Sequence, residues 1–306
     1  MFIEINSITK KYDEIFALKN FNLSLEKGEI ISIIGPSGSG KSTILKCISG
    51  ICRIDSGKII INNKRVDHQP INKRNISYVF QESPLFPHLN ITKNILFNLK
   101  NYDKEKLYFL LNKTKLEHIQ NKYPFQISGG ENQRAAVVRS LIRNPDLFLL
   151  DEPFNNLDNS NKNQLKEVIV DIIKETNTTT IFVNHETQDS LDISDKILIL
   201  VDGKTETIDS PINIYKKPKN LKIAKMFGEI NELIVDDKKV YCRIQNLTVV
   251  TKSSIKAKVI ESKFIGQFYK IKALVNTKLI TLLHVKNIKK DEIIYLKINK
   301  ENQLHF

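Results

Sequence analysis

The stretch that decides the fold is the apolar run Ile30–Ile34 followed by Gly35-Pro36-Ser37-Gly38-Ser39-Gly40-Lys41-Ser42-Thr43. The run predicts a buried strand, and the glycine-rich turn leads from it into a helix that begins near Lys41. The turn fits the pattern G-x4-G-K-[ST], in which glycines let backbone N–H groups curl around phosphate oxygens. Lys41 would reach the β- and γ-phosphates, and the Ser42 hydroxyl would ligate Mg²⁺. The stretch therefore predicts an ATP site that uses residues 35–43.

A second buried strand, Leu147–Leu150, ends in the two acids Asp151 and Glu152. Ligands of open parallel sheets bind beyond the carboxyl ends of the strands, which would place Asp151 beside the phosphate loop. There Asp151 would hold Mg²⁺ through water, and Glu152 would polarise the attacking water as general base. A strand that merely meets a capped helix is the alternative interpretation, and the presence of the phosphate loop makes it the weaker one.

The remaining patterns predict strands that alternate with helices, hence a parallel sheet wrapped by helices. Asp55-Ser56-Gly57 indicates a hairpin-type turn before Lys58–Ile61, and either Asn90 or Thr92 would cap a helix. The further segments are expected helices at 104–119, 131–143 and 160–175 and expected strands at 180–183 and 196–201. We expect an α/β domain over residues 1–230.

The pattern changes after about residue 230, where short alternating strands recur and helix-length periodic segments are missing. The expected strands are 240–244, 255–260, 269–275, 279–283 and 292–298. Residues 231–306 are therefore predicted to form a small all-β domain, most simply a barrel.

Composition agrees with a two-domain globular protein, since 41% of the 306 residues are hydrophobic and 26% are charged. No apolar run approaches the roughly 18 to 20 residues that cross a bilayer, and the N-terminus lacks a signal-peptide pattern. We therefore expect a soluble, unexported protein. The three cysteines, Cys47, Cys52 and Cys242, lack metal-site spacing, which predicts buried spectator thiols in a reducing compartment.

The net charge of +13 is uneven, because residues 231–306 hold 15 Lys and Arg against 7 Asp and Glu. A basic surface of this kind could face nucleic acid or an anionic membrane. The residues form no dense basic block and few aromatics are interleaved among them. A solvated Lys- and Asn-rich surface is the interpretation we favour.

Another glycine-rich helix start lies at Ile127-Ser128-Gly129-Gly130-Glu131-Asn132-Gln133-Arg134. Ser128 and the bare amides of Gly129 and Gly130 would form a second anion-binding helix N-terminus. One chain with one ATP does not need two cradles for the γ-phosphate. Two chains arranged head to tail would need both, since each would complete the site of the other.

Taken together, residues 1–230 resemble the ABC transporter ATPase family, which implies a P-loop NTPase domain with a helical subdomain. The resemblance implies that Tyr12 is the aromatic residue that stacks on adenine. It also implies that Gln81 is the Q-loop glutamine that senses Mg²⁺ and water. Asn156-Leu157-Asp158 is similar to the D-loop, and His185 to the switch histidine that contacts the γ-phosphate. The chain departs from the family pattern at Asn155-Asn156 and at Asn184, and none of these changes removes a catalytic group.

The small β domain resembles the TOBE-type, OB-like domain of importer ATPases. This implies a homodimer that drives integral membrane permease subunits, and through them a solute-binding protein, from the cytoplasmic face of the inner membrane. The segment Leu85-Phe86-Pro87-His88-Leu89 favours ferric iron as cargo. Polyamine, molybdate or sulfate importers are the alternative. The role of the β domain stays open between dimer contact, regulation by a bound small ligand, or both.

Two other functional classes remain open. A soluble ATPase acting on ribosomes or nucleic acid would suit the pI near 9.4, although relatives of that kind usually carry two cassettes. A purely regulatory subunit is the other, and the complete catalytic set argues against it. We expect no nucleic-acid partner.

Overall fold

The computed structural model of the protein describes residues 1–81, 84–155, 159–235 and 238–306. The chain divides into two compact units, Met1–Pro211 and Ile212–Phe306. The second unit begins earlier than residue 231 because it includes most of helix α7 (Pro211–Lys216) and helix α8 (Leu221–Met226). The functional domains 1–230 and 231–306 stay a prediction.

The first unit is built on a six-stranded sheet. Its strands lie in the order β10 (Lys204–Asp209), β9 (Lys196–Val201), β3 (Ile30–Ile34), β8 (Thr180–Val183), β7 (Leu147–Asp151) and β6 (Ile76–Val79). The five strands from β9 to β6 are parallel, and β10 pairs antiparallel at the edge. The predicted parallel sheet is confirmed. Its carboxyl edge receives the loops that carry the candidate site residues.

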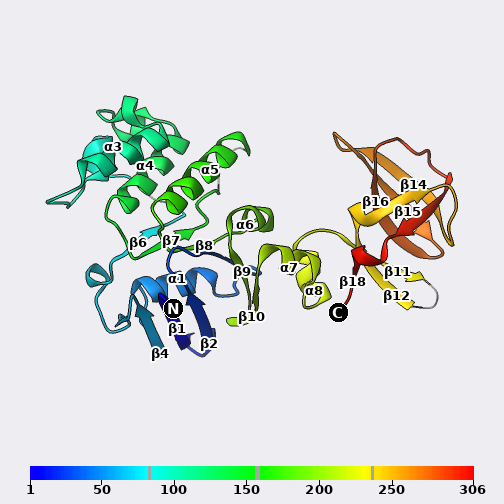
Figure 1. The fold of residues 1–306 in the computed structure, drawn as a ribbon, viewed down its shortest axis with the longest axis horizontal. Helices are drawn as coiled ribbons and strands as arrows, with labels where there is room; N and C mark the ends of the chain where they lie inside the picture. Colours follow the sequence, from blue (N-terminus) through cyan, green and yellow to red (C-terminus); the bar gives the residue numbers. More distant parts are fainter. Residues whose placement is uncertain (82–83, 156–158, 236–237) are drawn as a thin grey trace. The chain divides into compact units, whose positions relative to one another are not determined.

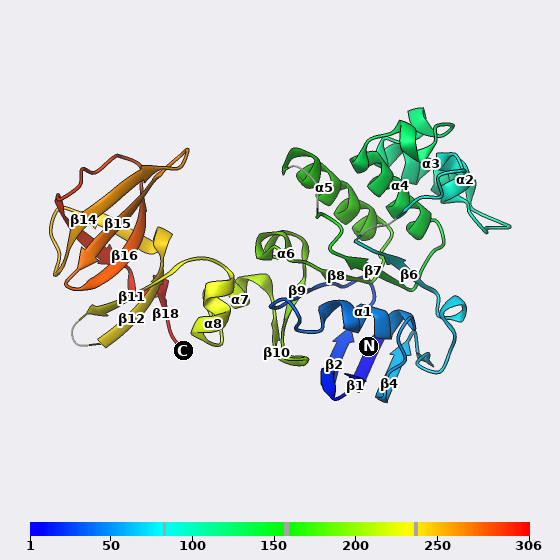
Figure 2. The same ribbon diagram turned by 180° about the vertical axis from the view of Figure 1, so that it is seen from behind.

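An antiparallel sheet covers one side of this layer. It comprises β2 (Ile15–Leu25), β1 (Ile3–Tyr12), β4 (Ser56–Ile61) and β5 (Lys64–Arg65) in that order. Helix α1 (Lys41–Ser49) lies between the two sheets, as Figures 1 and 2 show from opposite sides. The helix buries Ile44, Leu45 and Ile48 between them. Packing on both faces therefore fixes the helix that follows the phosphate loop.

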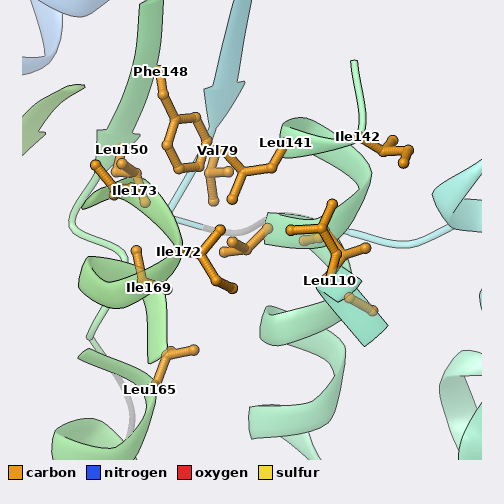
Figure 3. Packing of buried hydrophobic residues seen from close by; sticks show 14 of the residues in the cluster. Val79, Leu110, Leu141, Ile142, Phe148, Leu150, Leu165, Ile169, Ile172 and Ile173 are labelled. Atoms are coloured by element: carbon orange, nitrogen blue, oxygen red, sulfur yellow. The ribbon is translucent and has the colours of Figure 1, made fainter. Parts of the chain in front are cut away.

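The other side of the parallel sheet is covered by helices α3 (Lys104–Thr114), α4 (Gly129–Leu141) and α5 (Asn159–Glu175). Strand β7 shows the reason for its unbroken apolar sequence: Phe148 and Leu150 face these helices, whereas Leu147 and Leu149 face the α1 layer. Figure 3 shows Phe148 and Leu150 packed near Ile173 of α5. A strand covered on both faces has no solvent side on which to place polar residues.

The turn predicted at Asp55-Ser56-Gly57 is wrong, because Ser56 and Gly57 belong to β4 and pair alongside β1. Gly57 adopts a φ of 101°, and a Cβ there would come within 2.7 Å of the β1 backbone. The glycine serves a close approach of two strands at an irregular register. The hairpin turn lies instead between β4 and β5 at Asn62-Asn63, where both residues have positive φ.

Helix boundaries differ from the sequence predictions by a few residues. Asn90, one of the two predicted caps, accepts a hydrogen bond from the backbone N–H of Lys93 and starts α2 (Ile91–Ile95). The helix predicted to reach residue 119 ends at Thr114, because Lys115 turns into the left-handed conformation with a φ of 55°. The remaining helix of this unit is α6 (Thr187–Ile193).

The second unit confirms the all-β prediction for the C-terminal region. Its strands are β11 (Ile230–Val235), β12 (Lys238–Arg243), β13 (Leu247–Val250), β14 (Ile255–Phe264), β15 (Tyr269–Val275), β16 (Lys278–His284), β17 (Ile293–Ile298) and β18 (Gln303–Leu304). They form sheets of three and five strands rather than the one expected barrel. The edge strands β13 and β16 of the larger sheet nevertheless lie side by side, which gives it a barrel-like curl.

A buried arginine joins the two helices of this unit to its strands. Arg243, at the end of β12, donates hydrogen bonds to the carbonyls of Tyr215, Ala224 and Phe227, at the ends of α7 and α8. Its guanidinium also stacks on the Tyr215 ring at 3.7 Å from the ring centroid. Burial lowers the pKa of Arg243. These contacts explain why α7 and α8 group with the β strands, which their sequence did not indicate.

Within the described ranges, no helix has both the length and the apolar character that a membrane span requires. The three cysteines are free, as predicted. Cys47 and Cys242 are buried, whereas Cys52 is only partly so.

Candidate nucleotide site

A pocket of about 330 Å³ opens at the carboxyl edge of the parallel sheet. It is lined by Tyr12, Ala17, Ser37, Gly38, Gly40, Lys41, Ser42, Thr43, Glu152 and His185. All but Ala17 are predicted site residues, and they come from β1, the phosphate loop with α1, and the ends of β7 and β8. The fold thus brings together segments more than 140 residues apart in sequence.

The backbone of the phosphate loop depends on glycine at two points. Gly40 has a φ of 102°, and a Cβ there would lie 2.4 Å from the Ala17 carbonyl oxygen. At Gly35 a Cβ would lie 2.2 Å from the carbonyl oxygen of Leu200 in β9. Between these points Pro36, Ser37 and Gly38 are exposed, whereas Ser39 is buried. The loop is held close to the parallel sheet at Gly35 and to strand β2 of the antiparallel sheet at Gly40, and its middle faces solvent.

Lys41 is folded back onto its own loop. Its Nζ donates hydrogen bonds to the carbonyl oxygens of Gly35 at 2.8 Å and Pro36 at 2.9 Å. Burial lowers the pKa of Lys41, and the charges of Glu152 and Asp151 oppose that shift. An ammonium group that is mostly withdrawn from water and donates to carbonyl oxygens is suited to bind an anion.

Of the three predicted metal ligands, Ser42, Gln81 and Asp151, the first and the last do meet. The Ser42 hydroxyl donates to Asp151 Oδ1 at 3.1 Å, and the Tyr78 hydroxyl donates to Asp151 Oδ2 at 2.9 Å. Burial, followed by the nearby Asp151 charge, raises the pKa of Tyr78, so its phenol stays protonated. One hydroxyl and one carboxylate fit Mg²⁺, which takes few protein oxygens and completes its shell with water and phosphate.

Within the described parts of the chain, no cluster of three or more His, Cys, Asp or Glu side chains could hold a metal by itself.

Glu152 sits at the mouth of the pocket in a strained backbone conformation. Its φ is 50°, unusual for a residue other than glycine, and its N–H donates to the Val183 carbonyl of β8 at 2.8 Å. The Asn155 side-chain amide donates to Glu152 Oε2. Strain of this kind persists only where surrounding contacts impose it. The contacts with Val183 and Asn155 hold Glu152 at the pocket, and its role as general base stays a prediction.

His185 is exposed and follows β8 at the same edge. The preceding Asn184 is buried and donates hydrogen bonds to the hydroxyls of Ser32 and Ser190 at 3.1 and 3.0 Å. The Asn184 side chain therefore ties the histidine loop to β3 and α6. His185 lines the pocket although Asn184 departs from the family pattern.

Tyr12 lies at the far side of the pocket, at the end of β1. The ring is 46% exposed, enough to offer a face to a base, and its hydroxyl lies 3.3 Å from Cys52 Sγ. That hydrogen bond, followed by burial, raises the pKa of Tyr12 to about 12. The ring is therefore neutral at physiological pH.

Comparisons with known proteins agree with this geometry. The sequence model of the family described as "ABC transporter" matches residues 18–155. The sulfate/thiosulfate import ATP-binding protein CysA of Synechocystis is 38% identical, over 76% of this chain and 67% of that protein. The spermidine/putrescine import ATP-binding protein PotA of Clostridioides difficile is 32% identical, over 93% of this chain and 92% of that protein. This chain belongs to the ABC transporter ATP-binding proteins of the importer type.

A solved structure also superimposes on this ABC protein. The dimeric, post-hydrolysis state of the ATP-binding cassette MJ0796, bound to ADP and phosphate, is 30% identical with a TM-score of 0.60. The match covers 68% of this chain and 98% of that one. The enzyme class predicted from the sequence, an ABC-type ATPase, is confirmed.

The second glycine-rich segment, Ser128–Gly130, starts helix α4 and does not line the pocket. Ser128 caps the helix: its hydroxyl accepts from the Glu131 N–H at 3.2 Å, and Glu131 Oε2 accepts from the Ser128 N–H at 2.8 Å. A Cβ at Gly129 would meet nothing within 4 Å. None of Ser128, Gly129 and Gly130 lines the pocket of the same chain.

Not every predicted site residue lines the pocket or lies within the described residues. Gln81 is exposed and is not among the residues that line the pocket. Asp158, with Asn156 and Leu157 of the expected D-loop, lies outside the described residues.

The sequence analysis missed three supporting side chains. Tyr78 contacts Asp151, and Asn155 contacts Glu152. Lys162 of α5 is buried and pairs with Glu186 at 2.5 Å and with Asp189 at 2.8 Å. It thereby joins α5 to the loop that carries His185. A buried lysine has no sequence signature, since its carboxylate partners lie more than 20 residues away.

Proposed function

We propose that two copies of this chain bind two ATP–Mg²⁺ between them and drive a membrane permease by hydrolysis. The observation that carries the proposal is the pocket that joins Lys41, Ser42, Glu152 and His185. The helix start at Ser128–Gly130 supports a head-to-tail partner, because it does not line the pocket of its own chain and would face the γ-phosphate of a second chain. The related cassette MJ0796 is likewise a dimer in its post-hydrolysis state.

Each residue has a task in this mechanism. The loop amides and Lys41 hold the phosphates, and Tyr12 stacks on the base. Ser42 and Asp151 would hold Mg²⁺, which supplies charge neutralisation at the phosphates. Glu152 accepts the proton of the attacking water, and His185 contacts the γ-phosphate. Gln81 and Asp158 would join from their own loops when the dimer closes.

A groove on the same unit is suited to the permease. It has a volume of about 770 Å³ and includes Pro84, Phe86, Phe97 and Leu99, and we propose the segment 84–99 as the part that docks the permease. Phe86 and Phe97 pack together with ring centroids 4.4 Å apart, and Phe97 is 43% exposed. Exposed aromatic surface beside a groove favours a partner. Such a partner would place this chain at the cytoplasmic face of the inner membrane, indirectly linked to a solute-binding protein.

We propose a polyamine as cargo. The relative that covers nearly all of both chains, including the C-terminal unit, is named for spermidine and putrescine import. The sulfate/thiosulfate relative is more identical but covers less of both chains, so a sulfate-class anion is the second candidate. Neither relative is named for iron, and the expectation of ferric iron finds no support in them. That the β unit is a TOBE-like domain stays a proposal.

The hydrolytic role is tested by Glu152→Gln. We expect ATP binding to remain and turnover to fall by at least about 100-fold, because a general base contributes roughly 10² to 10⁴ in rate. A closed dimer trapped with ATP should appear by size-exclusion chromatography. Glu105→Gln, which makes the same charge change at an exposed position of α3, is the matched control. Hydrolysis at the wild-type rate in Glu152→Gln would remove Glu152 from the mechanism.

The transport role is tested by a mild-detergent pull-down from native cells, followed by uptake of labelled spermidine, sulfate and ferric iron. A polytopic membrane protein should co-purify with the wild-type chain and be lost with Phe97→Glu. Tyr108→Glu, which changes another exposed aromatic residue, is the control. Ribosomal or DNA-bound partners without a permease would overturn the transport proposal and leave only the ATP chemistry.

A further inference from the structure

The loop that follows helix α1 holds the end of strand β1. The Asp55 N–H donates to the Thr9 carbonyl at 2.9 Å, and Asp55 Oδ2 accepts from the Lys11 N–H at 2.6 Å. Asp55 Oδ1 also accepts from Lys10 Nζ at 3.1 Å. Three contacts from one residue therefore fix the backbone just before Tyr12.

Cys52 of the same loop contacts Tyr12 itself. The Tyr12 hydroxyl and Cys52 Sγ lie 3.3 Å apart, and the Cys52 N–H donates to the Lys46 carbonyl at 3.0 Å in the last turn of α1. Helix α1 begins at Lys41 in the phosphate loop. A short, continuous series of contacts thus connects the Tyr12 ring to the helix that carries the phosphate loop.

A cation limits the ring on another side. Lys10 Nζ, held by Asp55, lies 5.4 Å from the centroid of the Tyr12 ring. The hydroxyl end is bound to Cys52, so the ring is restrained at its tip and over its surface. An aromatic side chain without such contacts would exchange among rotamers. Order imposed before a ligand arrives reduces the entropy that binding costs.

We propose that Cys52 is a positioning residue for nucleotide binding, which sets the Tyr12 ring at a fixed place relative to the phosphate loop. The inference rests on the proposed role of Tyr12 as the surface on which the base stacks. Base–aromatic stacking contributes about 1–3 kcal/mol per base. A Tyr12 ring without the contact to Cys52 would keep only part of that stacking energy. Cys52 would therefore affect affinity for ATP and leave the chemical step unchanged.

The test is a double-mutant cycle between Cys52→Ala and Tyr12→Phe, with KM for ATP and kcat measured for each. Tyr12→Phe keeps the ring and removes the hydroxyl. We expect each single change to raise KM by about twofold to tenfold, the range of one hydrogen bond, at constant kcat. The double variant should show no further rise, because both changes remove the same contact. Cys52→Ser should restore part of the affinity.

Cys47→Ala is the matched control, because Cys47 is a buried thiol of α1 in the core between the sheets. It should leave KM unchanged, and the melting temperatures of all variants should be recorded. Additive effects in the cycle, or an unchanged KM in Cys52→Ala, would overturn the positioning role.

A further variant, Tyr12→Ala, distinguishes a failure of the positioning role of Cys52 from a failure of the proposed role of Tyr12 in nucleotide binding. If Tyr12→Ala raises KM and Cys52→Ala does not, only the positioning role is wrong. If Tyr12→Ala also leaves KM unchanged, Tyr12 is not part of the nucleotide site and both statements fail for that residue.

Discussion

Two helices of the first unit start at glycine-rich segments, and they are built differently. Helix α1 follows Gly40, which has a φ of 102° and provides no side-chain cap. Helix α4 follows Ser128, which has an ordinary φ of −69° and forms a capping box with Glu131. The first start leaves its amides to a ligand, whereas the second satisfies part of its own hydrogen bonding.

The glycines of the two segments therefore serve different purposes. At Gly40 the backbone conformation and the nearby Ala17 carbonyl exclude any side chain. At Gly129 the conformation is ordinary and the space is open. Gly40 shapes the phosphate loop of its own chain, whereas Gly129 leaves space that the proposed partner chain can use. The comparison predicts that the same substitution impairs different steps at the two positions, ATP binding at Gly40 and hydrolysis in the dimer at Gly129.

The largest effect is expected for Gly40→Ala. A left-handed conformation and a contact of 2.4 Å are both unfavourable for alanine, so the phosphate loop must change shape. We expect ATP affinity to fall on the order of 100-fold, since two strained features cost about 1–3 kcal/mol each. Equilibrium binding of a fluorescent ATP analogue measures this. Lys41→Ala should change affinity in the same direction, and wild-type affinity in Gly40→Ala would contradict the comparison.

Gly129→Ala should leave ATP binding to the monomer unchanged. Replacing a helical glycine by alanine is favourable by up to about 1 kcal/mol, so the fold should not suffer. The new methyl group would nevertheless occupy the space that the proposed partner's γ-phosphate needs. We expect hydrolysis at high protein concentration to fall roughly tenfold through loss of electrostatic stabilisation by these amides. Unchanged turnover would mean that the α4 start does not serve the site of a partner.

The smallest effect is a pH dependence of stability, which we expect at the start of α4 and not at the start of α1. The hydrogen bond that the Ser128 N–H donates to Glu131 is the main cause that lowers the pKa of Glu131 below its ordinary value of 4.5. A carboxylate with a lowered folded-state pKa contributes stability above the unfolded value, and that stability is lost as pH falls through the folded value. We expect hydrogen exchange at the start of α4 to increase below about pH 4.5.

The matched variant for this prediction is Glu131→Gln, which cannot titrate and should remove most of the pH dependence. Ser128→Ala keeps the backbone N–H, so it should destabilise α4 by about 0.5–2 kcal/mol through the lost hydroxyl cap and leave most of the pH dependence in place. Helix α1 has no titratable cap and should show no comparable change. An acid response of equal size at both helix starts would contradict the assignment to Glu131.

The phosphate loop, Glu152 and His185 could be predicted because each follows a short apolar strand, and the pattern of strand and polar residues is local. The positions of β3, β8 and β9 agree with their predicted bounds for the same reason. Gly57 was misread as a turn residue, because its positive φ serves contact with β1 rather than a chain reversal. Local pattern alone does not distinguish these two uses of glycine.

The second unit shows that contacts between distant residues cannot be predicted from the sequence pattern. Its alternating strands were visible in the sequence, but the division into two sheets and the inclusion of α7 and α8 were not. Both depend on contacts across the chain, such as the hydrogen bonds of Arg243 to carbonyls 16 to 28 residues away. A buried arginine has the same appearance in sequence as an exposed one.

The sequence by itself determined the chemistry of this protein: a loop for phosphates, two acids after a buried strand, and a second helix start that one chain does not need. These features are encoded in neighbouring residues, where backbone geometry and periodicity act directly. Only the tertiary structure decided which groups support them, including Tyr78 on Asp151, Asn155 on Glu152, Lys162 beside the His185 loop and Cys52 on Tyr12. Tyr78 meets Asp151 because neighbouring parallel strands end at one edge of a sheet, and the other partners meet through packing of loops and helices that no local pattern records.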